Sequence, residues 1–555
     1  MKKIINGGRG LLRAAWFRWG LACTAASLAA VGIVYYWRVF YEFTGIASLP
    51  MTLLAVVFAL VAVGAVWAVL HLAKSFHVRA GLAVLLCGAC FCFANPPMQT
   101  PDEGSHFLRA YAISEGRFDF DGERGYPDDV NALMACFPGA WANGNTTYWL
   151  KEDSSGNVTG GGSSAGFAIK EVNGQRIGLG ERFAAYRQMC AAGNAPKVTE
   201  PQVVQLLPYL HQALFMAAAR LMGFGALGCL YAGRLANLVV YALLCFLALK
   251  NCRRYSGVFL AVALLPMSLY IAASCNYDAL MLGFYYLTVS YYCVDELHDR
   301  DLAVFMVAFV MVNAVKPWIN LLWIVVPLIL PARVWKARIK KWQLAVLVLV
   351  LALGITMAVE WYGQGFRTGF DDGRMLGETV SMGGQLSFVL AHLPRTLMVF
   401  LGTLYENVLY LGKLGVFGAL DLEIPLVGLL SPVILMLGAA LSTHERSSLT
   451  PRSAVGLGAL TLAYTGGVLA AQYITYTPVG MIRVLGVQTR YLLPAFLMLF
   501  VLIAALLSRV LEPVRSGGVK AQALCLSACA GFALLAAVLL AQHYFIGPVC
   551  MVPGP

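Results

Sequence analysis

The chain has 555 residues, of which 59% are apolar and 12% are charged. Soluble domains contain about 25% charged residues, so this composition excludes a soluble enzyme, a disordered scaffold and a disulfide-rich secreted module. The net charge of +12 does not indicate nucleic-acid binding, because the basic residues lie in short loops between apolar segments and not on one soluble face. The sequence therefore predicts a polytopic membrane protein without a nucleic-acid partner.

Thirteen apolar segments approach the length of about 20 residues that a helix needs to cross a bilayer. In chain order they are residues 21–37, 51–72, 80–95, 229–249, 257–274, 279–294, 302–315, 319–330, 344–359, 424–441, 455–471, 492–507 and 521–540. Polar residues interrupt two further segments, 203–222 and 386–411. We predict that these two lie in, or dip into, the outer membrane interface. The predicted fold class is an all-α polytopic membrane protein with about 13 transmembrane helices.

The distribution of Lys and Arg predicts the orientation of these helices, because short cytoplasmic loops carry most of these residues. Five basic residues precede the first apolar segment, and the main basic loops are 74–79, 250–254, 333–341, 446–452 and 509–520. All of these loops fall on one side if the two interrupted segments do not cross the membrane. The N-terminus is then cytoplasmic and the C-terminus lies outside.

Residues 96–205 differ in composition from the rest of the chain. This segment of 110 residues has 22 charged side chains, or 20%, whereas the remainder has about 10%. We expect an extracytoplasmic insertion of α/β or irregular structure, in which Cys136 and Cys190 either form a disulfide or remain free thiols. The predicted domains are N-terminal transmembrane helices (1–79), a core transmembrane helix (80–95), the insertion (96–205) and a transmembrane body (206–555).

The most informative polar residues follow the third apolar segment. Three prolines end that helix, and Asp102 and Glu103 then lie at the membrane interface. A predicted helix with His106 and Arg109 comes next. Carboxylates at the edge of a bilayer are costly and usually functional. The alternative is a structural helix N-cap, which Asp102 also fits.

Residues 96–116 resemble the signature Pro-Pro-Asp-Glu-Pro-x-His-Phe-x-Arg-Ala-Tyr-x-Ile-Ser-Glu-Gly of a bacterial membrane family, domain of unknown function 2142. Four later segments also resemble motifs of this family: 274–278 (Ser-Cys-Asn-Tyr-Asp), 316–317 (Lys-Pro), 412–415 (Gly-Lys-Leu-Gly) and 486–494 (Gly-Val-Gln-Thr-Arg-Tyr-Leu-Leu-Pro). The resemblance covers about residues 80–510. Gly104 replaces the usual proline and Thr489 the usual glycine. The two N-terminal helices and the long insertion at 119–200 are additions to the family pattern, which leaves the choice of acceptor open.

The resemblance implies a GT-C-like glycosyltransferase of the bacterial cytoplasmic (inner) membrane, with its active site on the extracytoplasmic side. Such an enzyme moves a sugar, with inversion, from a polyprenyl-phosphate donor to a glycan or lipid acceptor of the cell envelope. A carboxylate takes the acceptor proton, and we assign this role to Asp102 with Glu103 beside it. Arginine binds phosphate through two hydrogen bonds, which assigns the donor phosphate to Arg490 with Lys316 as a second cation.

Further residues are predicted to contact the substrates: His106, Arg109, Asn276, Asp278, Gln488 and Tyr491. Asn276 and Asp278 orient the sugar or hold a divalent cation, although a helix cap explains them equally well. Snorkelling at the interface is the alternative for Arg490 and Lys316. No spacing of His or Cys indicates a bound metal.

Two other functions compete with glycosyl transfer. A transporter or flippase of lipid-linked glycans should place charges at mid-membrane and show inverted repeats. Here the polar residues gather at the outer helix ends, with Arg234 as the main exception. An enzyme like an O-antigen ligase or polymerase uses the same class of donor but moves whole glycans, and the sequence separates it poorly from the first reading.

Overall fold

The computed structural model describes residues 75–118, 125–137, 149–152, 158–161, 179–198, 206–252, 254–316, 319–362, 374–375, 378–409, 411–418, 420, 422–442, 449–510, 518–541 and 544. The predicted crossings at 21–37 and 51–72 lie outside the described residues. The described chain is mainly helical, with three short two-stranded pairs.

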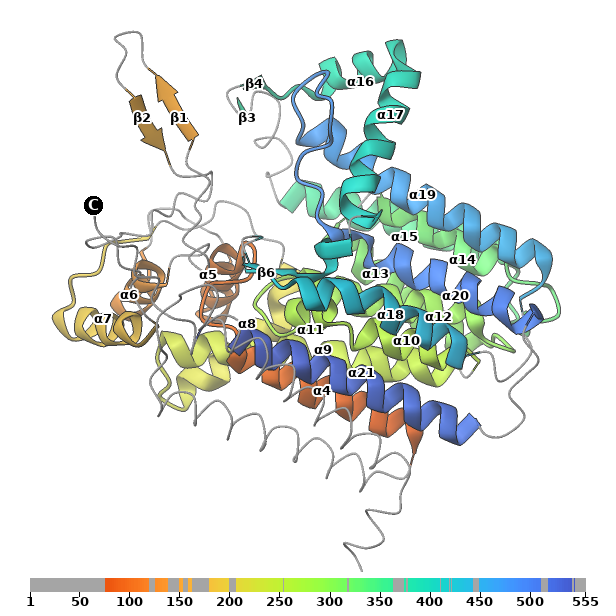
Figure 1. Ribbon diagram of the computed structural model, residues 1–555, viewed down its shortest axis with the longest axis horizontal. Helices are drawn as coiled ribbons and strands as arrows, with labels where there is room; N and C mark the ends of the chain where they lie inside the picture. Colours follow the sequence, from red (N-terminus) through yellow and green to blue (C-terminus); the bar gives the residue numbers. More distant parts are fainter. Residues whose placement is uncertain are drawn as a thin grey trace, which may run out of the picture.

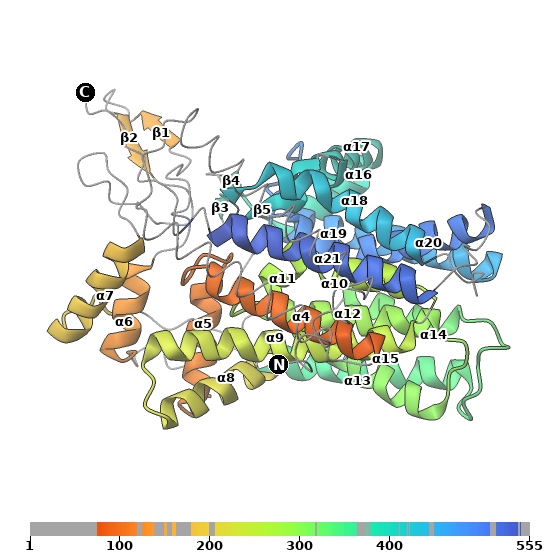
Figure 2. The ribbon, with the colours of Figure 1, turned by 60° about the horizontal axis from the view of Figure 1, so that its bottom comes forward.

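Five helices of the described residues are long and apolar enough to cross a membrane. They are α4 (Phe76–Ala94), α9 (Ala226–Asn251), α19 (Pro451–Thr475), α20 (Leu493–Val510, preceded by the turn η6, Thr489–Leu492) and α21 (Gly518–Ala541). Helix α4 packs between α9 and α21 in the bundle (Figures 1 and 2). The predicted crossing at 80–95 therefore forms a helix of the bundle, packed against two other crossing helices.

Several other predicted crossings form shorter or broken helices. Residues 257–274 divide into α10 (Ser256–Ala263) and α11 (Pro266–Ala272), because Pro266 lacks the N–H group that would continue α10. Residues 319–330 form the 3-10 turn η2 (Ile319–Ile324) and α14 (Val325–Leu328). The described residues therefore do not confirm 13 continuous crossing helices. The other helices of the body are α12 (Asp278–Ser290, followed by η1, Tyr291–Cys293), α13 (Asp299–Val315), α15 (Lys341–Tyr362) and α18 (Pro425–Leu441).

Neither interrupted segment forms one straight crossing helix. Helix α8 (Leu206–Leu221) has 16 residues and packs on α9. The second segment forms α16 (Met382–Ala391) and α17 (Leu393–Leu404), and these two helices meet at a bend of 108°. Helix α17 then continues into η4 (Tyr405–Leu409). This bend gives either a broken span or a re-entrant hairpin, and the prediction that both segments stay at the outer interface remains a prediction.

The insertion is an α/β segment in its described parts. It contains α5 (Glu103–Ser114), α6 (Asp128–Cys136), α7 (Leu179–Ala192) and an antiparallel pair of β1 (Trp149–Glu152) and β2 (Val158–Gly161). These elements gather at one end of the bundle, whereas the basic connection between α14 and α15 lies at the other end (Figures 1 and 2). The two cysteines of the insertion, Cys136 and Cys190, are free thiols in this structure.

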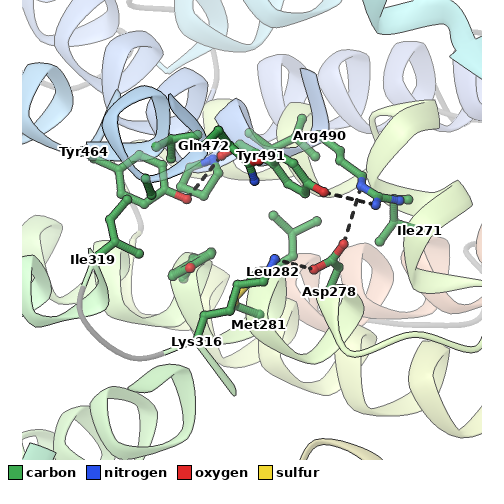
Figure 3. Close-up of a pocket in the computed structure, with 15 residues that line it drawn as sticks. Ile271, Asp278, Met281, Leu282, Lys316, Ile319, Tyr464, Gln472, Arg490 and Tyr491 are labelled. Atoms are coloured by element: carbon green, nitrogen blue, oxygen red, sulfur yellow. Dashed lines mark hydrogen bonds and ion pairs between the residues drawn. The ribbon is translucent and has the colours of Figure 1, made fainter. Parts of the chain in front are cut away.

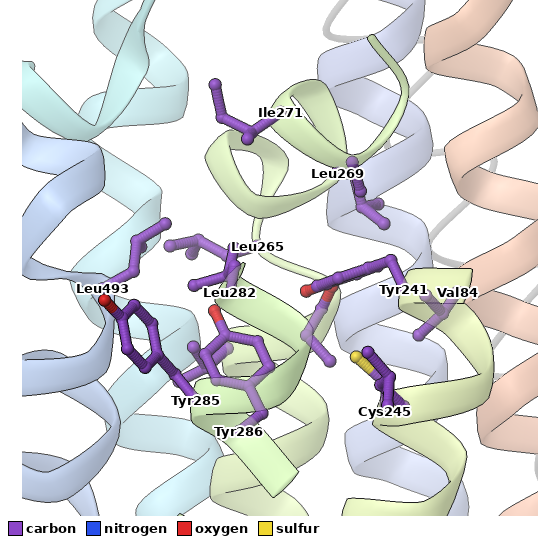
Figure 4. Close-up of a cluster of buried hydrophobic side chains, with 14 of the residues drawn as sticks. Val84, Tyr241, Cys245, Leu265, Leu269, Ile271, Leu282, Tyr285, Tyr286 and Leu493 are labelled. Atoms are coloured by element: carbon purple, nitrogen blue, oxygen red, sulfur yellow. The ribbon is translucent and has the colours of Figure 1, made fainter. Parts of the chain in front are cut away.

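A buried core of aromatic and aliphatic side chains holds α9, α11 and α12 together (Figure 4). Its tyrosines have hydrogen-bond partners, as buried hydroxyls require. Tyr241 donates to the carbonyl of Ala263 at 3.1 Å, and Tyr285 donates to Asn320 Oδ1 at 2.7 Å. Asn320 also donates to the carbonyl of Lys316. This core therefore fixes the start of α12 relative to the chain that follows α13.

Candidate functional site

A cluster of charged side chains lies where three segments of the bundle begin or end. Asp278 is the first residue of α12, Lys316 directly follows α13, and Arg490 lies in η6 before α20. Asp278 Oδ1 is 3.6 Å from Lys316 Nζ, and Asp278 Oδ2 is 3.4 Å from Arg490 Nε (Figure 3). The fold thus brings together three predicted site residues that are far apart in the sequence.

Two tyrosine rings flank the Lys316 ammonium. Its Nζ lies 4.9 Å from the ring centroid of Tyr277 and 4.9 Å from that of Tyr491. The Tyr491 hydroxyl also accepts a hydrogen bond from Arg490 Nη2 at 3.4 Å. Cation–π contacts of this kind stabilise an ammonium that is partly removed from water. The sequence analysis identified Tyr491 but not Tyr277, although Tyr277 lies inside the 274–278 motif.

These residues line a cavity of about 100 Å³ with mostly apolar walls. The side chains of Asp278 and Arg490 are 11% and 7% exposed. Asp278 Oδ1 and Arg490 Nε are buried and make no hydrogen bond within the described residues. Buried polar atoms without such a bond are costly, so a ligand with hydroxyl or phosphate groups would complete this site. The apolar wall includes Ile271, Met281, Leu282, Ile319, Val468 and Leu493.

Asp102 is a second carboxylate next to Arg490. Its Oδ2 is 3.9 Å from Arg490 Nη2, and its side chain is 70% exposed. Asp102 occupies the N-cap position of α5 but makes no capping hydrogen bond with its side chain, and its backbone is left-handed with φ of 60°. The carboxylate is therefore not used as a structural cap, which was the alternative to a functional role.

Glu103 points away from the cavity, although the sequence analysis placed it beside the catalytic base. Its side chain is fully buried and forms an ion pair with Arg234, with Glu103 Oε2 and Arg234 Nη2 2.7 Å apart. The backbone N–H of Cys275 donates to Glu103 Oε1 at 3.0 Å. A carboxylate with both oxygens occupied in this way has no access to a substrate. The structure thus corrects the catalytic assignment of Glu103 and accounts for the unusual position of Arg234.

His106 and Arg109 lie on the next turns of α5 and converge on Tyr209 of α8. His106 Nδ1 is 2.6 Å from the Tyr209 hydroxyl, and Arg109 Nη1 donates to the same hydroxyl at 3.5 Å. Because a guanidinium only donates, the Tyr209 proton is available for Nδ1 of a neutral imidazole. Burial, followed by the charge of Arg109, lowers the pKa of His106 to about 3. The ring of His106 also stacks edge-on against Tyr277 at 4.8 Å, which connects α5 to the charged cluster.

Of the remaining residues that were predicted to contact the substrates, one has a structural role and the others lie in the site. Asn276 is buried, and its Oδ1 accepts from the backbone N–H of Ala279 at 2.7 Å, so this residue caps α12. The helix-cap interpretation is thus correct for Asn276 but not for Asp278, which contacts two cations. Gln488 lies beside Arg490, and its Oε1 is buried without a hydrogen bond. No local motif indicates a role for Tyr209, because its contacts with His106 and Arg109 join residues about 100 positions apart in the sequence.

A divalent cation has no evident place among the described side chains. They contain no group of three His, Cys, Asp or Glu residues that could hold a metal ion. Asp102 and Asp278 both lie within ion-pair distance of Arg490, and this guanidinium already neutralises charge at the two carboxylates. We therefore derive no step from a metal at this site.

The fold and the site define the class of protein. Several long apolar helices, with charged residues collected at helix ends, form a mostly helical, multi-pass membrane protein. Residues 206–500, more than half of the chain, match the model of the family described as predicted membrane protein (DUF2142), and the chain belongs to this family. No curated protein and no solved structure matches the chain. The matched region contains Asp278, Lys316 and Arg490 but not the segment around Asp102.

Proposed function

We propose that the protein is a GT-C-like membrane glycosyltransferase that moves a sugar from a polyprenyl-phosphate donor to a glycan or lipid acceptor of the cell envelope. The position of Arg490 is the observation that supports this most. Its buried guanidinium lies at the start of an apolar helix, 3.4 Å from the Asp278 carboxylate and 3.9 Å from that of Asp102. A permanent planar cation in this place suits a lipid-linked phosphate.

The reaction is a single displacement at the anomeric carbon, with inversion. The acceptor oxygen forms the new bond to this carbon, while the bond between the carbon and the phosphate oxygen breaks. The polyprenyl phosphate leaves with the bonding electrons, and Arg490 stabilises the charge that develops on it. Asp102 takes the proton of the acceptor hydroxyl. Atoms and charge balance without a metal ion or a nucleotide.

The two carboxylates next to Arg490 differ in their availability as a base. Asp278 is buried and paired with both Lys316 and Arg490, so its lone pairs are directed at cations. Asp102 is 70% exposed and has no capping bond, so an acceptor hydroxyl can reach it. We therefore assign the base to Asp102, while Asp278 orients the two cations and hydroxyl groups of the sugar.

The extracytoplasmic position of the site follows from the distribution of charge and is part of the proposal. The insertion and the basic loop between α14 and α15 lie at opposite ends of the bundle (Figure 2). Labelling with an impermeant thiol reagent in intact cells tests this, in a background in which Cys23, Cys190 and Cys550 are replaced by Ser, because the other cysteines are buried. We expect Gly160→Cys to react and Arg338→Cys not to react. The reverse pattern would place the site on the cytoplasmic side.

Release of the carrier lipid tests the activity itself. Purified protein in nanodiscs is incubated with single polyprenyl-phosphate sugars and an extract of cell-envelope glycans, and free polyprenyl phosphate is measured. We expect release with at least one donor, and its loss in Asp102→Asn. Movement of the intact donor across a vesicle membrane without release would instead support a flippase. Transfer of whole oligosaccharides with no transfer of single sugars would support a ligase-like enzyme.

A further inference from the structure

A second cavity lies against Arg490, and the proposed mechanism does not yet use it. Its volume is about 120 Å³, and it shares Arg490 and Ile271 with the first cavity. Its walls come from α11, from the chain before α20 and from the turn around Lys413. Pro101, directly before Asp102, also lines it. This cavity therefore lies next to the proposed base.

The two cavities differ in charge. The first contains the carboxylate of Asp278 together with Lys316 and Arg490. The second contains Lys413 and Arg490, and its described lining residues include no Asp or Glu, with the exposed Asp102 next to its wall at Pro101. Opposite charges attract more strongly in a site that is shielded from water. An anionic group is thus favoured more in the second cavity than beside Asp278.

Polar groups of the second cavity can bind more than a simple ion. The side chain of Arg490 is 7% exposed, and the amide oxygen of Gln488 is buried without a hydrogen bond. Asn407 and Thr489 also line the cavity, and Thr489 Oγ1 donates to the carbonyl of Asn407. A hydroxyl group of a ligand could donate a hydrogen bond to the Gln488 amide oxygen. A phosphate of the same ligand could accept two hydrogen bonds from Arg490.

The turn that carries Lys413 is held rigidly. Its Gly415 carbonyl accepts from the N–H of Ile424 at 2.8 Å. A side chain at Gly415 would come within 2.5 Å of the backbone of Gly428 in α18, so only glycine permits this packing. The hairpin of β5 (Val416–Phe417) and β6 (Leu422–Glu423) then closes the turn. The Gly-Lys-Leu-Gly motif at 412–415 therefore holds the Lys413 ammonium at the wall of the second cavity.

We propose that this second cavity binds the phosphate of an isoprenoid carrier lipid, with Arg490 and Lys413 as its two cations. The proposal rests on the proposed function and makes it more specific. In this arrangement Lys316 orients Asp278 and does not contact the donor phosphate. Asp102, which follows Pro101 in the wall of the same cavity, takes the proton of the acceptor hydroxyl, and this hydroxyl attacks the anomeric carbon from the face opposite to that phosphate.

Binding of decaprenyl phosphate to the full-length protein in nanodiscs tests the proposal, with decaprenol and sodium phosphate as comparison ligands. We expect Lys413→Met to weaken binding of decaprenyl phosphate about tenfold or more, since a charge-assisted hydrogen bond is lost. Lys413→Arg should retain most of the affinity. Arg483→Met removes a cation outside both cavities, where Arg483 is 57% exposed and pairs with Glu406, and should leave binding unchanged. Melting temperatures of all variants verify that they are folded.

Each alternative outcome has a separate meaning. If wild-type protein binds decaprenyl phosphate no better than decaprenol, both the proposed function and this inference are wrong. If wild type prefers the phosphate but Lys413→Met binds as well, the donor site remains and the second cavity is rejected. Loss of binding in Lys316→Met alone would then place the phosphate in the first cavity. If sodium phosphate competes at equal concentration, the ligand is free phosphate and the lipid assignment is overturned.

Discussion

The carboxylate of Glu103 and the guanidinium of Arg234 form a buried ion pair with two parallel hydrogen bonds, of 2.8 Å to Nε and 2.7 Å to Nη2. Glu103 directly follows Asp102, and it also accepts from the backbone N–H of Cys275, three residues before Asp278. The pair therefore fixes the spacing between the two carboxylates that flank the donor site. Glu103 is a positioning residue.

Replacement of Glu103 by Gln should destabilise the protein. The substitution leaves the Arg234 charge buried without a counter-ion, which costs about 3–5 kcal/mol in comparable sites. We expect a lower melting temperature and a lower yield of folded protein in detergent. The double variant Glu103→Met, Arg234→Met should recover much of this loss, because it removes both charges. A Glu103→Gln protein that is as stable as wild type but inactive would instead indicate a catalytic role.

Asp102→Asn should leave the fold intact and reduce the rate of sugar transfer by about 10²–10⁴. Asparagine tolerates the left-handed backbone that Asp102 adopts, and no side-chain capping bond is lost. The measurement is the initial rate of polyprenyl phosphate release at saturating donor. Asp299→Asn, at an exposed position in another part of the protein, serves as the matched control and should be unchanged. Transfer by Asp102→Asn at the wild-type rate would move the base elsewhere.

The sequence was sufficient to predict the helical membrane class. The thickness of the bilayer sets the length and the apolar composition of a crossing helix, and both can be read directly from the sequence. It could not predict which segments break. Pro266 divides one predicted crossing, and the bend between α16 and α17 lies at His392, two residues before Pro394. A proline alone does not show whether a helix breaks, because α18 continues through Pro432. Such breaks depend on packing between distant elements, as at Asn320, whose side chain bonds the end of α13.

The charged residues of the site could be predicted from the sequence, because the charge of each side chain indicates its chemistry. Arg490, Lys316 and Asp278 were identified from motifs that resemble those of the family, together with the chemistry of their charged side chains, and the structure brings them together. The neighbours Asp102 and Glu103 look alike in sequence but face opposite sides, because α5 begins between them and turns Glu103 towards Arg234. This difference follows from the three-dimensional arrangement, so no local pattern contains it.

His106 should make stability depend on pH. Its folded-state pKa is about 3, whereas an unfolded histidine has a pKa of about 6.5. Below pH 6.5 the unfolded chain binds a proton that the folded protein does not, so stability falls by about 1.4 kcal/mol per pH unit. His106→Gln should reduce this dependence, as measured by unfolding between pH 6.5 and 5, and His298→Gln at an exposed position should retain it. Parallel pH profiles for wild type and His106→Gln would show that His106 is charged in the fold.

Arg490→Lys should weaken donor binding although the charge is retained. The guanidinium contacts Asp278 through Nε and both Asp102 and Tyr491 through Nη2, and a lysine ammonium cannot reproduce this fork. We expect an increase of about tenfold or more in the donor concentration that gives half-maximal rate, equal to about 1.4 kcal/mol of binding energy. Arg490→Ala should weaken donor binding further. Arg483→Lys should require the same donor concentration for half-maximal rate as wild type. Equal donor dependence of Arg490→Lys and wild type would reduce Arg490 to a cation that snorkels to the interface.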